Sequence, residues 1–195
     1  MKETKRKRRL VALWMVGVLA MSYVPVSAAH FRDMSAAHWA YASIEWAAEE
    51  GIVGGYEDGT FQPSRMVSEA EFLVMYMHYF FNMKSVPTGN LRGEHWASSY
   101  YATAVDLHIP FQGGSYKDRP IRRGLVARTV TKALGYDYSE KQAVEWLLKK
   151  EIVTGRTPGN ATYASYAPDE PLTRAEAAQF FKTLHRKGYT RFITN

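Results

Sequence analysis

The feature that most constrains this chain is an internal repeat with a period of about 50 residues. Residues 44–55 return 100 residues later as residues 144–155, and the His-Trp-Ala of residues 38–40 returns 57 residues later. Three further segments align, at steps of 54 and 51 residues, on one position each: Glu69, Arg123 and Arg174. A unit of this size cannot bury its own apolar face, so three are expected to pack together in this chain of 195 residues.

Each repeat is predicted to form a helix, a loop and a second helix. In the first repeat, apolar residues recur at helical spacing over residues 40–48, and Asp33 or Ser35 is expected to cap this helix. Gly51 should end it, because glycine readily adopts the left-handed conformation that closes a helix. The second repeat is the most eroded, since residues 108–110 replace this glycine stop.

Two further helices begin with the spacing of a capping box, in which a hydroxyl and a side-chain carbonyl or carboxylate bond each other's backbone amides. One box is Ser68 with Glu71, and the other is Ser139 with Gln142. The helices of the three repeats are expected to bury these apolar residues: Ala70, Leu73, Val74, Met77, Ala97, Tyr101, Ala104, Val105, Val126, Val130, Ala133, Leu134, Val144, Leu147, Leu148, Ala177, Phe180, Phe181 and Leu184.

The last helix starts with a third capping box, Thr173 and Glu176. Arg174 lies between them on the first helical residue, where it is expected to point away from the core beside free backbone N–H groups. Those amides and the helix dipole favour an anion, and a guanidinium adds a bidentate grip on a carboxylate. This helix start could therefore hold an acidic ligand.

The positive charge of the chain is concentrated at its start. Five of the six net charges lie before residue 10, so nucleic-acid binding loses its main support. The apolar run of residues 10–21 and the small residues 26–28 follow, which is the pattern of a secretory signal peptide. We expect cleavage after Ala28 or Ala29 and no membrane association afterwards; the alternative is an uncleaved anchor, but the run is shorter than the roughly 20 residues that span a bilayer.

The sequence offers no pattern of a catalytic or metal site. It contains no cysteine, which removes disulfides and thiol catalysis, and its six histidines lack the spacing of metal ligands. The motifs of serine nucleophiles, zinc hydrolases and phosphate loops are missing. We therefore expect no enzyme activity, no catalytic residue, no metal and no cofactor.

Several motifs together resemble the S-layer homology (SLH) domain family: residues 31–34, 38–40, 51–56, 58–63 and 172–176. The resemblance covers the chain after the leader in three copies, of which the first and third are clearest and the second is degenerate. The expected division of the chain is a signal peptide over residues 1–29, SLH repeat 1 over 30–83, SLH repeat 2 with its connector over 84–136, and SLH repeat 3 with a C-terminal tail over 137–195.

The resemblance implies an all-α fold of three helix-loop-helix repeats, packed as a pseudo-threefold trimer around a central three-helix bundle within one monomer. It implies an exported protein bound non-covalently to secondary cell-wall polysaccharide of Gram-positive bacteria, commonly through pyruvylated sugars held in grooves between repeats. Carried over by position, it nominates these ligand-binding residues: Arg174, Arg123, Asp33, Trp39, Trp96, Gly55 and Gly155.

The sequence departs from the family pattern at two helix starts. Glu69 stands where the first repeat would offer an arginine, and its charge would repel a carboxylate ligand. Leu125 replaces the capping glutamate behind Arg123, so that helix start is expected to be less well fixed. One or two working grooves are therefore expected.

Other roles stay open for several of these residues. Arg122 could serve in place of Arg123, Trp39 and Trp96 could pack in the core instead of on a sugar, and Asp33 could only cap a helix. The leading function is binding of an anionic, pyruvylated wall polysaccharide at the cell surface. The alternative is a degenerate SLH scaffold that binds another envelope protein, and a hydrolase is a third class.

Overall fold

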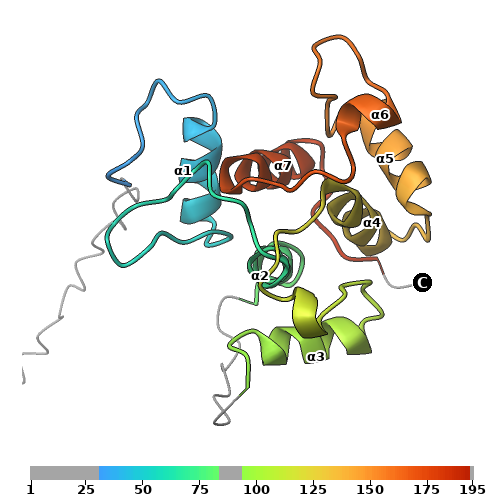
Figure 1. The fold of residues 1–195 in the computed structure, drawn as a ribbon, viewed down its shortest axis with the longest axis horizontal. Helices are drawn as coiled ribbons and strands as arrows, with labels where there is room; N and C mark the ends of the chain where they lie inside the picture. Colours follow the sequence, from blue (N-terminus) through green and yellow to red (C-terminus); the bar gives the residue numbers. More distant parts are fainter. Residues whose placement is uncertain (1–30, 84–93, 194–195) are drawn as a thin grey trace, which may run out of the picture.

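A computed structural model describes residues 31–83 and 94–193 (Figure 1). The elements are α1 (Tyr41–Glu49), α2 (Glu69–Phe81), α3 (Ser98–Asp106), the 3-10 helix η1 (Gly114–Tyr116), α4 (Arg123–Ala133), α5 (Glu140–Lys149), α6 (Tyr163–Tyr166) and α7 (Arg174–Arg186). The described residues contain helices and no strand, so the all-α prediction is confirmed. The predicted signal peptide and most of the connector before α3 lie outside the described residues.

The helices pair across repeat boundaries. α3 packs on α2, α5 packs on α4, and α1 packs on α7 at the other end of the chain. The first helix of each repeat therefore rests on the second helix of the preceding repeat, and the first repeat is joined to the third. None of these described helices is long and apolar enough to cross a membrane.

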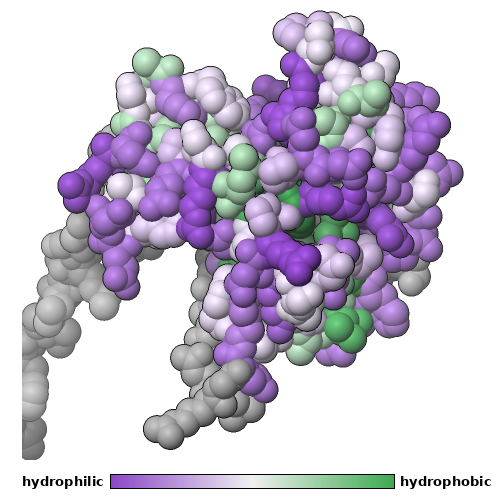
Figure 2. All heavy atoms as spheres, viewed as in Figure 1, coloured by the Kyte–Doolittle hydropathy of each residue, from purple (hydrophilic) through white to green (hydrophobic). Residues whose placement is uncertain are grey.

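A ring of backbone hydrogen bonds joins the segments that lead into α2, α4 and α7. The Val67 amide donates to the Leu172 carbonyl (2.9 Å), the Leu172 amide to the Ile121 carbonyl (3.1 Å), and the Ile121 amide to the Val67 carbonyl (2.9 Å). All three residues are buried. This ring favours the predicted threefold trimer, although the packing of α2, α4 and α7 as a central bundle stays a prediction. Figure 2 shows a mostly hydrophilic face with hydrophobic residues in the hollow at its middle.

The core is built largely from the predicted apolar faces. Aromatic contacts join α2 to α7, where the Phe72 and Phe181 rings stack with centroids 5.5 Å apart. Val105 is the exception, because 72% of its surface is exposed. It lies one residue beyond Ala104 at the end of α3, and the helical rotation of about 100° per residue turns it to solvent.

The predicted capping boxes of α2, α5 and α7 are all present, and Gly51 has the left-handed φ of 68° that ends α1. The predicted cap of α1 by Asp33 or Ser35 is wrong. Ala40 occupies the N-cap without a side-chain hydrogen bond, and the helix starts from a turn in which His38 Nδ1 accepts from the Ala40 amide (3.2 Å).

Two features of the loops were not predicted. His108 adopts a left-handed φ of 54°, so the second repeat keeps the geometry of the stop without the glycine. The loop of the third repeat contains the short helix α6, which the Thr162 hydroxyl caps. The predicted boundaries between repeats stay predictions.

Candidate functional site

The first residues of α2, α4 and α7 are buried side chains that reach into a neighbouring repeat. Glu69, Arg123 and Arg174 expose only 2%, 7% and 5% of their surface. The prediction that Arg174 points away from the core is therefore wrong. Its position at a helix start faces another repeat instead of solvent, because the chain segments of two repeats meet there.

Arg174 joins α7 to the loop of the first repeat. Its Nε donates to the Phe61 carbonyl (2.8 Å) and its Nη2 to the Gly54 carbonyl (2.6 Å). The guanidinium carbon lies 4.8 Å from the centre of the Tyr56 ring and 4.5 Å from that of Phe61. Burial lowers the pKa of Arg174, which the Tyr56 and Glu71 side chains oppose. These contacts give Arg174 a structural role, and its predicted role in ligand binding stays a prediction.

The backbone amides at the start of α7 are occupied. The Arg174 amide donates to the Arg65 carbonyl (2.9 Å), the Ala175 amide to the Pro63 carbonyl (3.0 Å), and the Glu176 amide to the Thr173 hydroxyl (3.2 Å). The expectation of free amides for an acidic ligand is therefore wrong. The first repeat, which packs against the third, supplies carbonyl acceptors for these amides, and the sequence of α7 alone does not reveal them.

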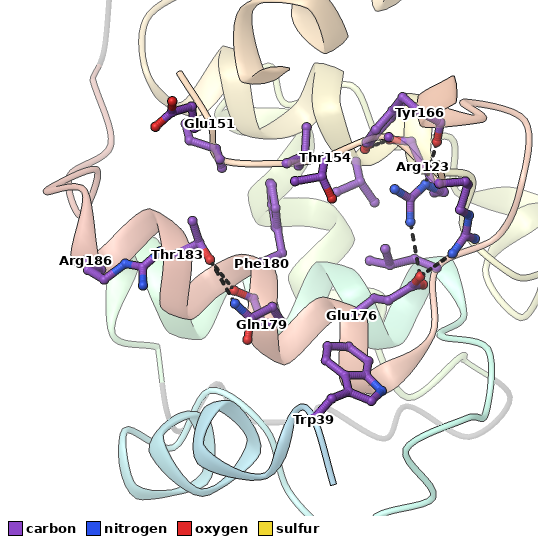
Figure 3. Close-up of a pocket in the computed structure, with 16 residues that line it drawn as sticks. Trp39, Arg123, Glu151, Thr154, Tyr166, Glu176, Gln179, Phe180, Thr183 and Arg186 are labelled. Atoms are coloured by element: carbon purple, nitrogen blue, oxygen red, sulfur yellow. Dashed lines mark hydrogen bonds and ion pairs between the residues drawn. The ribbon is translucent and has the colours of Figure 1, made fainter. Parts of the chain in front are cut away.

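A groove of about 400 Å³ lies between α4, α7 and the loop of the third repeat, with Trp39, just before α1, at its edge (Figure 3). Its lining comes from all three repeats and includes Trp39, Arg123, Gly155, Arg156, Tyr166 and Glu176. We call it the Trp39 groove. It brings together three predicted residues, Trp39, Arg123 and Gly155, and Arg174 is not among its lining residues.

Arg123 is fixed at one end of the Trp39 groove. Its Nε donates to the Tyr166 carbonyl (2.9 Å), its Nη1 bonds Glu176 Oε1 (3.3 Å), and its guanidinium carbon lies 4.5 Å from the centre of the Tyr166 ring. The Tyr166 hydroxyl donates to the Arg123 carbonyl (3.1 Å). Burial raises the pKa of Tyr166 to about 12, so this hydroxyl stays a donor at neutral pH.

Arg156 is a second guanidinium in the groove, and sequence reasoning missed it. Its Nη1 donates to Glu176 Oε1 (2.6 Å) and its Nε to Glu170 Oε2 (2.9 Å). Although burial acts to lower it, pairing with Glu176 and Glu170 raises the pKa of Arg156. The available signal was its place directly after Gly155, in the loop that matches the loop of the first repeat.

Glu176 connects these two arginines to the helix cap. Its Oε1 lies between Arg123 and Arg156, while its Oε2 accepts from the Thr173 amide (2.9 Å). The prediction of a capping role is confirmed, and the carboxylate has this additional role in the groove. With Arg186 and Glu151 included, the lining has three basic and two acidic residues, so its net charge is positive.

The two tryptophans are exposed, so the alternative of core packing is wrong for both. Trp39 lies at the edge of the groove (Figure 3) and exposes 63% of its surface, and Trp96 exposes 44%. Trp96 does not line the Trp39 groove. An exposed indole beside a positively charged groove offers a flat apolar surface to a ligand.

Three weaker candidates have structural explanations. A Cβ at Gly55 would overlap the Phe31 ring, and one at Gly155 would overlap Asn160 and Ser165. Asp33 accepts from the Phe61 amide (2.8 Å) and the Gln62 amide (2.7 Å), so it fixes the loop of the first repeat. Their predicted contact with a ligand stays untested.

The comparison with known proteins agrees with the repeat pattern. Residues 30–73 and 136–178 match the S-layer homology domain. These two segments are S-layer homology domains. The two matched segments fall in the first and third repeats, which have the clearest motifs.

The chain is similar to anchoring, S-layer and outer membrane proteins of several bacteria. It is 31% identical to the cellulosome-anchoring protein of Acetivibrio thermocellus, over 38% of the chain and 18% of that protein. It is 26% identical to S-layer protein EA1 of Bacillus anthracis, over 96% of the chain and 24% of that protein. It is 41% identical to outer membrane protein SlpA of Thermus thermophilus, over 29% of the chain and 6% of that protein. The chain thus spans about a quarter or less of these relatives.

Proposed function

We propose that the SLH chain holds an exported protein at the surface of a Gram-positive cell wall by binding an anionic secondary cell-wall polysaccharide. The family match and the names of the relatives, which include S-layer and anchoring proteins, support a surface role. The observation that carries the proposal is the Trp39 groove, where an exposed indole and two guanidiniums line one cleft. One chain is the proposed binding unit.

The chemistry of the groove fits a sugar that carries a carboxylate, such as a pyruvyl ketal. Trp39 would pack against the apolar face of the ring, and the ketal carboxylate would meet Arg123. The contacts of Arg123 within the described residues use Nε and Nη1, so Nη2 is the nitrogen that we assign to the ligand. A charge-assisted hydrogen bond of this kind contributes about 1.5–3 kcal/mol.

Glu176 pairs with both guanidiniums of this site. Its carboxylate neutralises part of the charge of Arg123 and Arg156, which keeps both guanidiniums in place before a ligand arrives. A ligand carboxylate would share these two cations with Glu176. The binding step is a reversible equilibrium and needs no covalent chemistry.

The test compares two exposed tryptophans in cosedimentation with purified wall polymer. Trp39→Ala should lower the affinity for pyruvylated polymer about tenfold, because an aromatic stacking surface is lost. Trp96→Ala is the matched control, since Trp96 is also exposed but lies outside the Trp39 groove. Equal affinity of Trp39→Ala and wild type would contradict the assignment of this groove.

Chemical removal of pyruvate from the polymer tests the ligand itself. The wild type should bind the stripped polymer more weakly, and Arg123→Gln should lose affinity for the intact polymer only. Retention that does not depend on pyruvate would instead favour an envelope protein or another glycan as the partner.

A further inference from the structure

The ends of α1 and α5 carry exposed charges of opposite sign at equivalent positions of two repeats. Glu49 and Glu50 are the last residue and the C-cap of α1, and the positions 100 residues later, at the end of α5, are Lys149 and Lys150. We call them the acidic pair and the basic pair. All four residues are exposed, and none of their side chains takes part in an ion pair among the residues that the structure describes.

Both pairs lie beside the end of α7. In α1, the Trp46 ring packs on His185 of the last turn of α7, with ring centroids 5.1 Å apart. In α5, the Trp146 ring packs on Tyr189, just after α7, with ring centroids 5.5 Å apart, and Lys150 Nζ lies 5.9 Å from the centre of the same indole. Figure 1 shows α1 and α5 on opposite sides of α7. One end of the molecule therefore has the acidic pair on one side and the basic pair on the other.

The two pairs belong to a wider separation of charge. The described part of the first repeat, residues 31–83, has two basic and eight acidic residues, which is a net charge of −6 with histidine neutral. The described residues 94–193 have 15 basic and 10 acidic residues, which is a net charge of +5. The first repeat is thus acidic and the rest of the described chain is basic. Two copies of such a molecule attract each other most when the acidic side of one faces the basic side of the other.

A cavity beside the acidic pair has room for a lysine side chain. It has a volume of about 400 Å³ and lies between the ends of α1, α2 and α7. Its lining includes Trp46, Glu50, Tyr79 and His185, and it includes no lysine or arginine. The stem of an entering lysine would pack on the aromatic rings, and its ammonium group would meet the Glu50 carboxylate near the negative ends of three helix dipoles. The cavity therefore fits the chemistry of the basic pair.

We propose that this end of the molecule binds a second copy of the chain, related to the first by a two-fold axis. The rotation places the acidic pair of one copy on the basic pair of the other and repeats the same contact in reverse. Each charged pair thus finds a partner, and the dimer is closed. The inference does not depend on the proposed function, because the cavity beside the acidic pair shares no lining residue with the Trp39 groove.

Sedimentation velocity of the purified protein tests this inference. The wild type should dimerise in about 0.05 M salt, and its dissociation constant should rise about tenfold in about 0.5 M salt, because salt screens exposed ion pairs. Reversal of the acidic pair by Glu49→Lys with Glu50→Lys should abolish the dimer, since two basic surfaces would then meet. Reversal of the basic pair by Lys149→Glu with Lys150→Glu should abolish it as well. A mixture of the two reversed variants should dimerise again, because every contact then joins opposite charges.

Glu57→Lys is the matched control for a change of net charge. Glu57 is also an exposed acidic residue of the first repeat, but it follows Tyr56, whose ring lies beside Arg174 at the other end of α7. This variant should dimerise as the wild type does. A wild type that stays monomeric in low salt overturns the inference and leaves a basic protein as the candidate partner of the acidic pair. A mixture of reversed variants that stays monomeric overturns it too, and so does a dimer that only one of the two reversals abolishes.

Discussion

The first helical residue of α2, α4 and α7 performs one structural task with two opposite charges. Arg123 and Arg174 donate to carbonyl groups of a loop in another repeat, while Glu69 accepts from a loop amide. The polarity of the hydrogen bond is reversed, but the connection between repeats is kept. Glu69, which in the sequence looks like the loss of a ligand site, therefore still connects two repeats in the structure.

A buried hydroxyl leads to the prediction at this scale. Tyr76 is fully buried beside Phe80 and Phe111, and its hydroxyl has no hydrogen-bond partner among the described residues. Tyr76→Phe removes a polar group that gains no bond on folding, so the free energy of unfolding should stay level or rise by about 1 kcal/mol.

Urea unfolding measures this effect, with Tyr166→Phe as the control. Tyr166 is as deeply buried, but its hydroxyl donates to the Arg123 carbonyl (3.1 Å), so its removal should cost about 1–3 kcal/mol. A large loss of stability in Tyr76→Phe would show that its hydroxyl has a partner after all.

At the scale of elements, helix starts depend on contacts that are distant in sequence. The boxes at Ser68, Ser139 and Thr173 are local and were predicted from spacing alone. The start of α4 has Arg122 at its N-cap without a side-chain cap, as the missing glutamate predicted. Its first two amides nevertheless donate to the carbonyls of Glu170 and Pro168, so the adjoining repeat fixes this helix start.

The loop of the third repeat gives the prediction for an element. Gly155→Ala should destabilise the protein by about 1–3 kcal/mol, because the new methyl group would overlap Asn160 and Ser165 and force the loop around α6 to shift. Gly54→Ala is the matched control one position earlier in the first repeat, where a Cβ meets no atom within 4 Å. Thermal unfolding of both variants checks this, and equal melting temperatures would contradict the packing argument.

Much of the fold could be predicted from the sequence, because helix periodicity and capping are local. The direction of Arg174 could not, since its partners Phe61 and Gly54 are over 100 residues away in the chain. Arg156 was missed because its role depends on meeting Glu176, which lies 20 residues later in the same repeat on the other side of the groove. Local patterns thus located the elements, whereas the site residues depend on contacts in the folded structure.

At the scale of the whole molecule, the chain closes on itself. α1 packs on α7, so the first repeat completes the last, and the other two pairs also cross a boundary. In each repeat, the first helix packs on a helix of a neighbouring repeat. We expect the three repeats to unfold together, because removal of one exposes the apolar faces of two others.

Buried tyrosines make the stability of this unit sensitive to alkaline pH. An unfolded tyrosine ionises near pH 10, whereas burial raises the pKa of Tyr166 to about 12 and also raises that of Tyr76. Between these values the unfolded chain loses protons that the folded chain keeps, so stability falls as pH rises above about 10. The slope should be about 1.4 kcal/mol per pH unit for each such tyrosine.

Urea unfolding at a series of alkaline pH values, with tyrosinate absorbance as a second probe, measures that slope. Tyr166→Phe should reduce the slope by the share of one tyrosine, even though it lowers stability at neutral pH. An unchanged slope in this variant would mean that Tyr166 ionises in the folded protein as it does in the unfolded chain.

The ring of hydrogen bonds among Val67, Ile121 and Leu172 also fixes the number of repeats in the fold. Each of the three amides donates to the next carbonyl, and the last bond returns to the first residue. A linear stack of repeats has free ends at which further repeats can be added, but this closed ring has no free end. A fourth repeat could join it only by breaking one of the three hydrogen bonds. A protein that needs more repeats of this kind would therefore have to add complete sets of three.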